Sequence, residues 1–210
     1  MRKDLLLLAA IGAVVALAFT VAAARGALPE RHDFNPLMHW SWRRSTIVVI
    51  LLSIAFGASW VAITRSDLGL KYPSATLEWV YSSDCAKEIV AGYGDMRSQA
   101  IRGVAIDSVA FIPSYVLLIA IAAFSLANGW PAERWAQWTV FAGWLAIFAG
   151  ALDYIENAGI FAALSGVTTR LAPLTYAACQ LKWLLVCSAG DFVVFAAIVR
   201  GYVSLRRHFA

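Results

Sequence analysis

The residues best suited to chemistry are ionisable side chains that lie inside apolar stretches of the sequence. Asp153, Glu156 and Asn157 stand at positions i, i+3 and i+4, so a helix would carry all three on one face. A charged side chain near the centre of a lipid bilayer costs at least about 2.5–3.5 kcal/mol. Carboxylates kept at such a cost bind protons, cations or charged ligands, or else join helices through hydrogen bonds.

Neighbouring apolar segments contain further polar residues of this kind. Asp107 and Tyr115 lie in the preceding segment, and Lys182 and Asp191 lie in the last one. Four acids therefore face one lysine, so at least two carboxylates lack a basic partner. They can be neutral, share protons as a coupled pair, or bind a cation. We predict a ligand-binding site formed by Asp107, Tyr115, Asp153, Glu156, Asn157, Lys182 and Asp191.

Whether the protein is an enzyme stays open at this stage. Asp153 and Glu156 are the candidate catalytic residues, because two neighbouring carboxyl groups can act as an acid and a base. The hydrogen-bonding side chains beside them would orient a ligand.

The composition indicates that helices in a membrane position these residues. Of 210 residues, 61% are hydrophobic and only 14% are charged, and the mean hydropathy is +0.70. Such a chain cannot cover a water-facing surface. Apolar stretches near the roughly 20 residues that cross a bilayer lie at about 5–24, 46–64, 104–126, 138–164 and 181–202. We predict an all-α fold, a polytopic transmembrane bundle with a four-helix core and one extra N-terminal helix.

Charged and polar stretches set the predicted boundaries. Residues 1–44 would hold the first helix, or a signal anchor, and a polar connector, and whether the first helix is cleaved stays open. Residues 45–205 would hold the four-helix core, with an outer helical connector at 65–103. Arginines at 43, 44, 206 and 207 flank the core. Because basic residues favour the cytoplasmic side, both ends of the core are expected there, which places the acids in the outer half of the membrane.

The outer connector has two further features. The run Ser82-Ser-Asp-Cys predicts a short amphipathic helix at about 84–92, with Ser83 or Asp84 as its cap. Cys85 and Cys179 would both lie on the outer side, so they either form a disulfide or remain free thiols.

Several classes of function are disfavoured. Lys and Arg lie at segment ends and form no basic stripe, so we predict no nucleic-acid partner. The sequence contains no P-loop, no Gly-x-Gly-x-x-Gly and no His-Glu-x-x-His motif. The histidines, at 32, 39 and 208, all lie outside the core segments, and the pair at 32 and 39 lacks a third ligand nearby. We therefore predict neither a metal site nor a cofactor.

Over roughly residues 45–205 the chain resembles a widespread group of uncharacterised four-helix bacterial membrane proteins. The motifs that carry the resemblance, in chain order, are Leu77-Glu-Trp79, Ala86-Lys-Glu-Ile-Val-Ala-Gly-Tyr93, Ile106-Asp-Ser-Val-Ala-Phe111 with Tyr115, Asp153-Tyr-Ile-Glu-Asn157 and Leu181-Lys-Trp183. The Asp-x-x-Glu-Asn motif is the most specific of these. The resemblance implies no reaction. We expect a multi-pass protein of the bacterial inner (cytoplasmic) membrane.

Three functions are consistent with this sequence. In the first, the acids bind a lipid-like or cationic amphiphilic ligand, with Lys182 balancing charge and Trp79 and Trp183 forming an aromatic rim. In the second, the chain is a proton- or cation-coupled transporter or channel, and a chain this short would then form a homo-oligomer. In the third, it is an accessory subunit of a membrane complex, and the acids hold the helices together. The lipid bilayer is a partner in every case.

Overall fold

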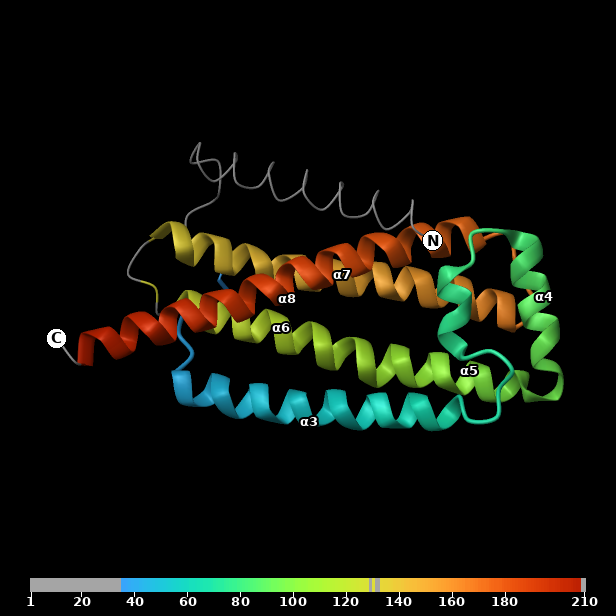
Figure 1. The fold of residues 1–210 in the computed structure, drawn as a ribbon, viewed down its shortest axis with the longest axis horizontal. Coiled ribbons are helices and arrows are strands. Elements are labelled where there is room, and N and C mark those ends of the chain that lie inside the picture. Colours follow the sequence, from blue (N-terminus) through green and yellow to red (C-terminus); the bar gives the residue numbers. More distant parts are fainter. Residues whose placement is uncertain (1–34, 129, 131–132, 209–210) are drawn as a thin grey trace. The chain divides into compact units, whose positions relative to one another are not determined.

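The computed structural model describes residues 35–128, 130 and 133–208, and these residues are helical with short connections (Figure 1). The helices are α3 (Trp42–Ser66), η1 (Ser74–Trp79), α4 (Ser83–Tyr93), η2 (Gly94–Met96), α5 (Arg97–Ile106), η3 (Asp107–Phe111), α6 (Ile112–Ala127), α7 (Glu133–Leu164) and α8 (Ala172–His208). Within the described ranges, four helical stretches are long and apolar enough to cross a membrane. The chain is an all-α, multi-pass membrane protein.

The structure contains the four predicted core spans and extends each of them. α3, α7 and α8 are 25, 32 and 37 residues long, and α4 to α6 form one continuous helical stretch of 45 residues. Hydropathy predicted only the part of each helix that crosses the lipid. Polar residues at the helix ends continue the helical hydrogen bonds, but they lower the mean hydropathy of the segment. The predicted span at residues 5–24 lies outside the described residues.

The helices are divided between two compact units. Among the described residues, unit 1 consists of 35–49, 118–128, 130, 133–147 and 184–208, and unit 2 of Ile50–Leu117 and Phe148–Trp183. All the predicted site residues except Asp191 belong to unit 2.

Small side chains allow close helix packing in unit 1. Ala123, Ala142, Ala146 and Ala189 form one buried cluster there. A Cβ atom added at Gly143 would lie 2.6 Å from the Phe124 ring, so α6 and α7 approach closely. Asn35 donates a hydrogen bond to the Phe124 carbonyl (3.1 Å), which ties the segment before α3 to α6.

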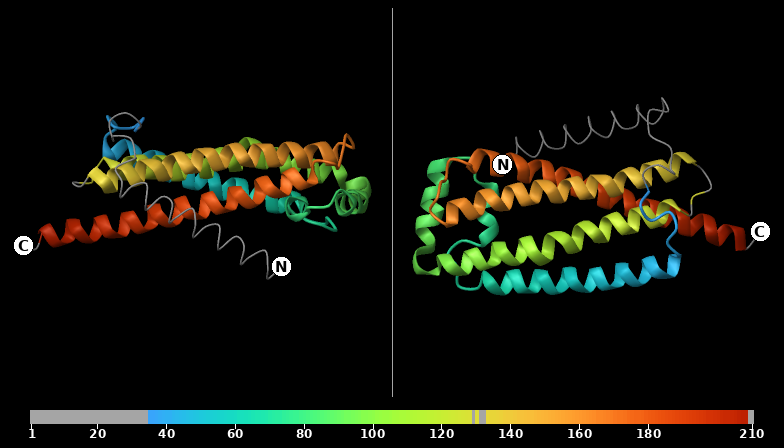
Figure 2. Two further views of the ribbon diagram at one scale, coloured as in Figure 1. Left: turned by 90° about the horizontal axis from the view of Figure 1, so that it is seen from above. Right: turned by 180° about the vertical axis from the view of Figure 1, so that it is seen from behind.

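In unit 2, α4 lies across the ends of the long helices and not parallel to them (Figures 1 and 2). It packs on a core that includes Leu77, Ala86, Val90, Tyr93, Ala100, Val104, Ile160 and Leu164. The predicted short helix at 84–92 is therefore present as α4. The predicted cap, Ser83 or Asp84, was wrong, since the Ser82 hydroxyl accepts hydrogen bonds from the N–H groups of Asp84 and Cys85.

A π-helical turn interrupts the third span where it enters the acidic region. The N–H of Ile112 donates to the carbonyl of Asp107, five residues earlier. Pro113 follows and has no N–H with which to continue this pattern to the Ser108 carbonyl. The hydroxyl of Tyr154 on α7 donates to that carbonyl instead, at 2.9 Å. The turn thus joins α7 to the third span.

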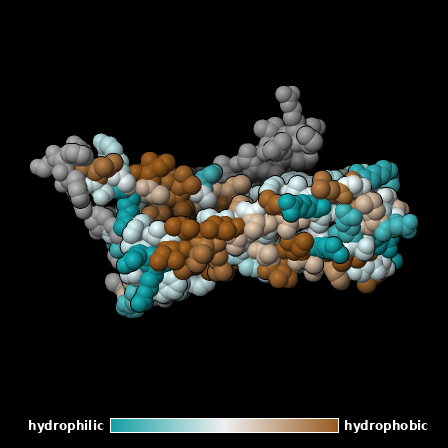
Figure 3. Space-filling model, turned by 90° about the horizontal axis from the view of Figure 1, so that it is seen from below, coloured by the Kyte–Doolittle hydropathy of each residue, from teal (hydrophilic) through white to brown (hydrophobic). Residues whose placement is uncertain are grey.

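Large hydrophobic side chains gather on the surface (Figure 3). On α3 they include Ile47, Ile50, Leu51, Ile54, Trp60 and Val61. Only 6% of the most apolar 18-residue stretch of this helix is buried inside the protein. A surface this apolar suits contact with lipid.

Gly150 tests whether close packing in unit 2 is needed. A Cβ atom there would lie 2.6 Å from Cγ2 of Val116, so Gly150→Ala should force the helices apart and destabilise the protein by about 1–3 kcal/mol. Gly57→Ala on α3 is the matched control, because nothing lies within 4 Å of its added Cβ. Thermal unfolding in detergent measures both variants, and equal Tm values would contradict the packing argument.

Candidate functional site

The i, i+3, i+4 spacing on α7 directs three polar residues into unit 2. Asp153, Glu156 and Asn157 are only 3%, 0% and 4% exposed. Tyr154 and Ile155 between them are each 47% exposed. The face predicted for the motif is therefore its buried face.

Lys182 on α8 occupies the centre of the site. Its ammonium lies 2.9 Å from Oδ1 of Asp153, 2.8 Å from Oε2 of Glu156 and 3.7 Å from Oε2 of Glu78. The lysine is 5% exposed. One buried cation is thus shared by three carboxylates from two elements, η1 and α7.

Tyr115 completes the surroundings of Asp153. Its hydroxyl donates to Oδ2 of Asp153 at 2.7 Å, while Lys182 donates to Oδ1 at 2.9 Å. Both oxygens of this carboxylate are therefore engaged. Such complete pairing is what allows a charged group to remain buried.

Asp107 belongs to a second, adjoining pair. Nδ2 of Asn157 donates to Oδ2 of Asp107 and lies 3.0 Å from the Ser108 hydroxyl. The Ser108 hydroxyl in turn donates to the Val104 carbonyl at 2.9 Å. Asn157 thus connects α7 to the π-helical turn, and it takes its orientation from two hydrogen bonds.

Glu78 is the site residue that the sequence did not predict. It lies in η1, within the outer connector, and its side chain is 16% exposed. Leu77 is buried in the unit 2 core, and the Ser74 N–H donates to Oδ1 of Asp67 (3.1 Å), so η1 is held in place. Two sequence signals pointed to it: the motif Leu77-Glu-Trp79 in the family resemblance, and an acid within the apolar run Leu77-Glu-Trp-Val80.

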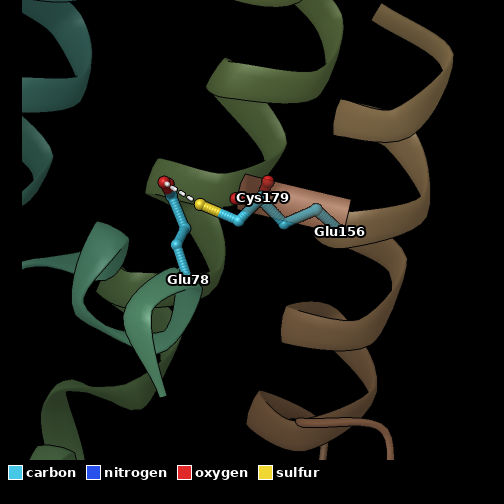
Figure 4. A group of neighbouring side chains, drawn as sticks. All are labelled: Glu78, Glu156 and Cys179. Atoms are coloured by element: carbon cyan, nitrogen blue, oxygen red, sulfur yellow. Dashed lines mark hydrogen bonds between the residues drawn. The ribbon is translucent and has the colours of Figure 1, made fainter. Parts of the chain in front are cut away.

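Cys179 brings a thiol next to the same carboxylate. Figure 4 shows the Glu78 and Cys179 side chains facing each other, and the thiol donates to Oε2 of Glu78 at 3.9 Å. Cys85, Cys179 and Cys187 are all free, so the disulfide considered between Cys85 and Cys179 is not formed.

Glu78, Glu156 and Cys179 could in principle hold a metal ion. One ligand atom of each lies within 4.8 Å of the others. However, the Lys182 ammonium already lies 3.7 Å from Oε2 of Glu78 and 2.8 Å from Oε2 of Glu156. The lysine therefore supplies the positive charge that a metal ion would bring.

The charges around Lys182 do not balance. Three carboxylates share one ammonium, so two negative charges remain uncompensated if all are ionised. Oε1 of Glu156 is also buried and has no hydrogen-bond partner among the described residues. Burial raises the pKa of Glu78 above its ordinary value of 4.5, which Lys182 opposes and Asp153 increases. A proton or another cation is needed to complete this site.

Asp191 is the one predicted site residue outside unit 2. It belongs to unit 1 and is exposed. The described hydrogen bonds and ion pairs of the other site residues do not include it, and its electrostatic neighbour is Cys187. Six of the seven predicted residues therefore lie in unit 2, in two adjoining groups. We use the name acidic cluster for Glu78, Asp107, Asp153, Glu156 and Lys182.

Comparisons with known proteins do not extend this description: no protein-family model, curated protein or solved structure matches the chain.

The raised pKa of Glu78 makes a prediction about stability and pH. The folded protein holds this proton more tightly than the unfolded chain, so its contribution to stability falls as the pH rises above about 4.5. Glu78→Gln should remove that part of the fall in Tm, measured in detergent across the pH range.

The groups that face Glu78 are Lys182, Asp153, Glu156 and Cys179, and all are kept in this variant. Glu88→Gln on α4 removes an exposed carboxylate and serves as the control. A pH slope in Glu78→Gln equal to that of the wild type would contradict the assignment.

Proposed function

We propose that the protein binds the amine group of a membrane amphiphile at the edge of the acidic cluster. The observation that carries the proposal is the sharing of one ammonium among three carboxylates, which leaves negative charge uncompensated. Glu78 is the carboxylate with the longest contact to Lys182 and the most exposed side chain of the three. It is therefore the one available to an incoming cation.

Aromatic side chains around this edge suit a ligand with an apolar body. Trp79 and Trp183 are 53% and 42% exposed and adjoin Glu78 and Lys182 in sequence. The Lys182 ammonium lies 5.3 Å from the centre of the Trp183 ring, and Tyr81 packs against Tyr176 of α8. Rings at a membrane surface contact both the apolar chain and the cationic head of an amphiphile.

The other residues take supporting roles in this proposal. Both oxygens of Asp153 are engaged by Tyr115 and Lys182, so Asp153 positions the lysine and does not act as a catalytic acid. When the ligand binds, Glu156 and Glu78 would release a proton, and the positive charge of the ligand would take its place. The proposal therefore describes a binding protein and not an enzyme.

We further propose that the membrane is the inner membrane of a bacterium and that the chain belongs to the four-helix group it resembles. Arg43 and Arg44 before the core and the arginines after it favour a cytoplasmic location for both ends. The Asp-x-x-Glu-Asn motif is the feature of that group that occupies the acidic cluster.

Dodecylammonium is a suitable probe, because it combines a primary ammonium with a single apolar chain. We expect the purified protein to bind it by isothermal titration calorimetry and to release protons into weakly buffered solution. Glu78→Gln should bind it at least about 10-fold more weakly, since one charged contact is lost. Glu88→Gln and the uncharged probe dodecanol are the controls. Binding that Glu78→Gln leaves unchanged would refute the proposal.

Proton- or cation-coupled transport is a second candidate, favoured by the short separation of Glu78 and Glu156. Two buried carboxyl groups this close can share and pass on a proton.

In proteoliposomes with an imposed pH gradient, this second function requires proton flux that Asp153→Asn and Glu156→Gln abolish and Glu88→Gln preserves. A pH-sensitive dye inside the vesicles measures the flux. Flux that is equal in all variants, or absent from the wild type, would exclude transport.

A further inference from the structure

A cavity whose charged lining is basic, in contrast to the acidic cluster, lies between α3 and α5 in unit 2. Its volume is about 620 Å³. The polar part of its lining consists of Arg65, Ser66, Ser98, Gln99 and Arg102, and no carboxylate takes part. The cavity is therefore suited to an anion and not to the cationic group proposed for the acidic cluster.

The two arginines are available to a ligand. Arg65 lies in the last turn of α3 and Arg102 lies on α5. Both are exposed, and within the described residues neither takes part in an ion pair. A guanidinium group presents a planar set of donors that matches two oxygens of a phosphate. The Ser98 hydroxyl and the Gln99 amide add neutral donors beside them, whereas the Ser66 hydroxyl already donates to the Ile63 carbonyl at 2.7 Å.

The helices that carry the arginines are held closely together. A Cβ atom at Gly103 would lie 2.9 Å from the Ser66 hydroxyl and 3.1 Å from that of Ser74, so α5 packs closely against the end of α3 and the start of η1. Nε2 of Gln99 also donates to the Leu68 carbonyl at 2.8 Å, just beyond the end of α3. The backbone positions of the two arginines are thus set by the fold.

The rest of the lining is apolar and continues onto a lipid-facing surface. Ala58, Val61 and Ala62 line the cavity from α3, and Val61 is 49% exposed. The same helix has only 6% of its most apolar window buried. A ligand with its anionic group at the arginines would therefore have its apolar part along α3.

We propose that this cavity binds the phosphate group of an anionic membrane phospholipid, with Arg65 and Arg102 as its cationic partners and α3 in contact with an acyl chain. Basic pockets between membrane helices bind such headgroups. The proposal is independent of the acidic cluster, because the two sites share no residue.

The experiment uses the full chain in a nonionic detergent. Phosphatidylglycerol at about 100 times its Kd should raise the Tm by about 5–10 °C. Diacylglycerol, which lacks the phosphate, and inorganic phosphate, which lacks the chains, should each give much smaller shifts. A shift from inorganic phosphate as large as that from the lipid would overturn the lipid assignment, and an equal shift from diacylglycerol would overturn the role of the phosphate.

The double variant Arg65→Gln/Arg102→Gln should bind phosphatidylglycerol at least about 10-fold more weakly by native mass spectrometry. Arg43→Gln/Arg44→Gln removes the same charge from the other end of α3 and should bind as the wild type does. Arg65→Lys/Arg102→Lys keeps the charge without the planar donors and should be intermediate. The proposal fails if the first variant retains full affinity or if the control loses as much.

Discussion

The ammonium group of Lys182 is the contact that connects the buried polar residues of unit 2. It lies within 4 Å of carboxylates from η1 and α7, so a connector and two membrane helices meet at one charge. Coulomb attraction is strong where water is excluded, but each carboxylate also loses its hydration on burial. The arrangement is stable only while the lysine remains, since without it three buried acids would have no cation. Glu78, at the exposed edge, is where this balance can be changed from outside.

Local backbone chemistry holds the groups around that contact. Pro113 cannot donate to the Ser108 carbonyl, and Tyr154 of α7 makes the missing hydrogen bond. The π-helical turn that results begins at Asp107, whose carboxylate then pairs with Asn157. A proline and a π-helical turn, which would weaken an isolated helix, therefore provide the hydrogen-bonding groups that join the third span to α7. This is how non-standard helical turns are often used near functional groups.

In unit 2 the acidic cluster and the cavity lined by Arg65 and Arg102 share no residue. The acids face inward around Lys182, where protein surrounds them. Arg65, in the last turn of α3, and Arg102, on α5, line an open cavity and have no acidic partner there. Long arginine side chains can reach the membrane surface at little cost, whereas short carboxylates within a span need partners in the protein. The two proposed sites therefore differ in the sign of the charge that they would bind.

The sequence by itself determined the all-α membrane fold, the four core spans and the buried face of Asp153, Glu156 and Asn157. These follow from hydropathy and from the 3.6-residue period of one helix, which are local properties. Only the tertiary structure decided that Glu78 contacts the same lysine as this face and that Asp191 belongs to the other unit. Those outcomes depend on how the connector folds back and how each helix is rotated against its neighbours. Packing between residues distant in the chain sets both, and a single-helix pattern carries no information about it.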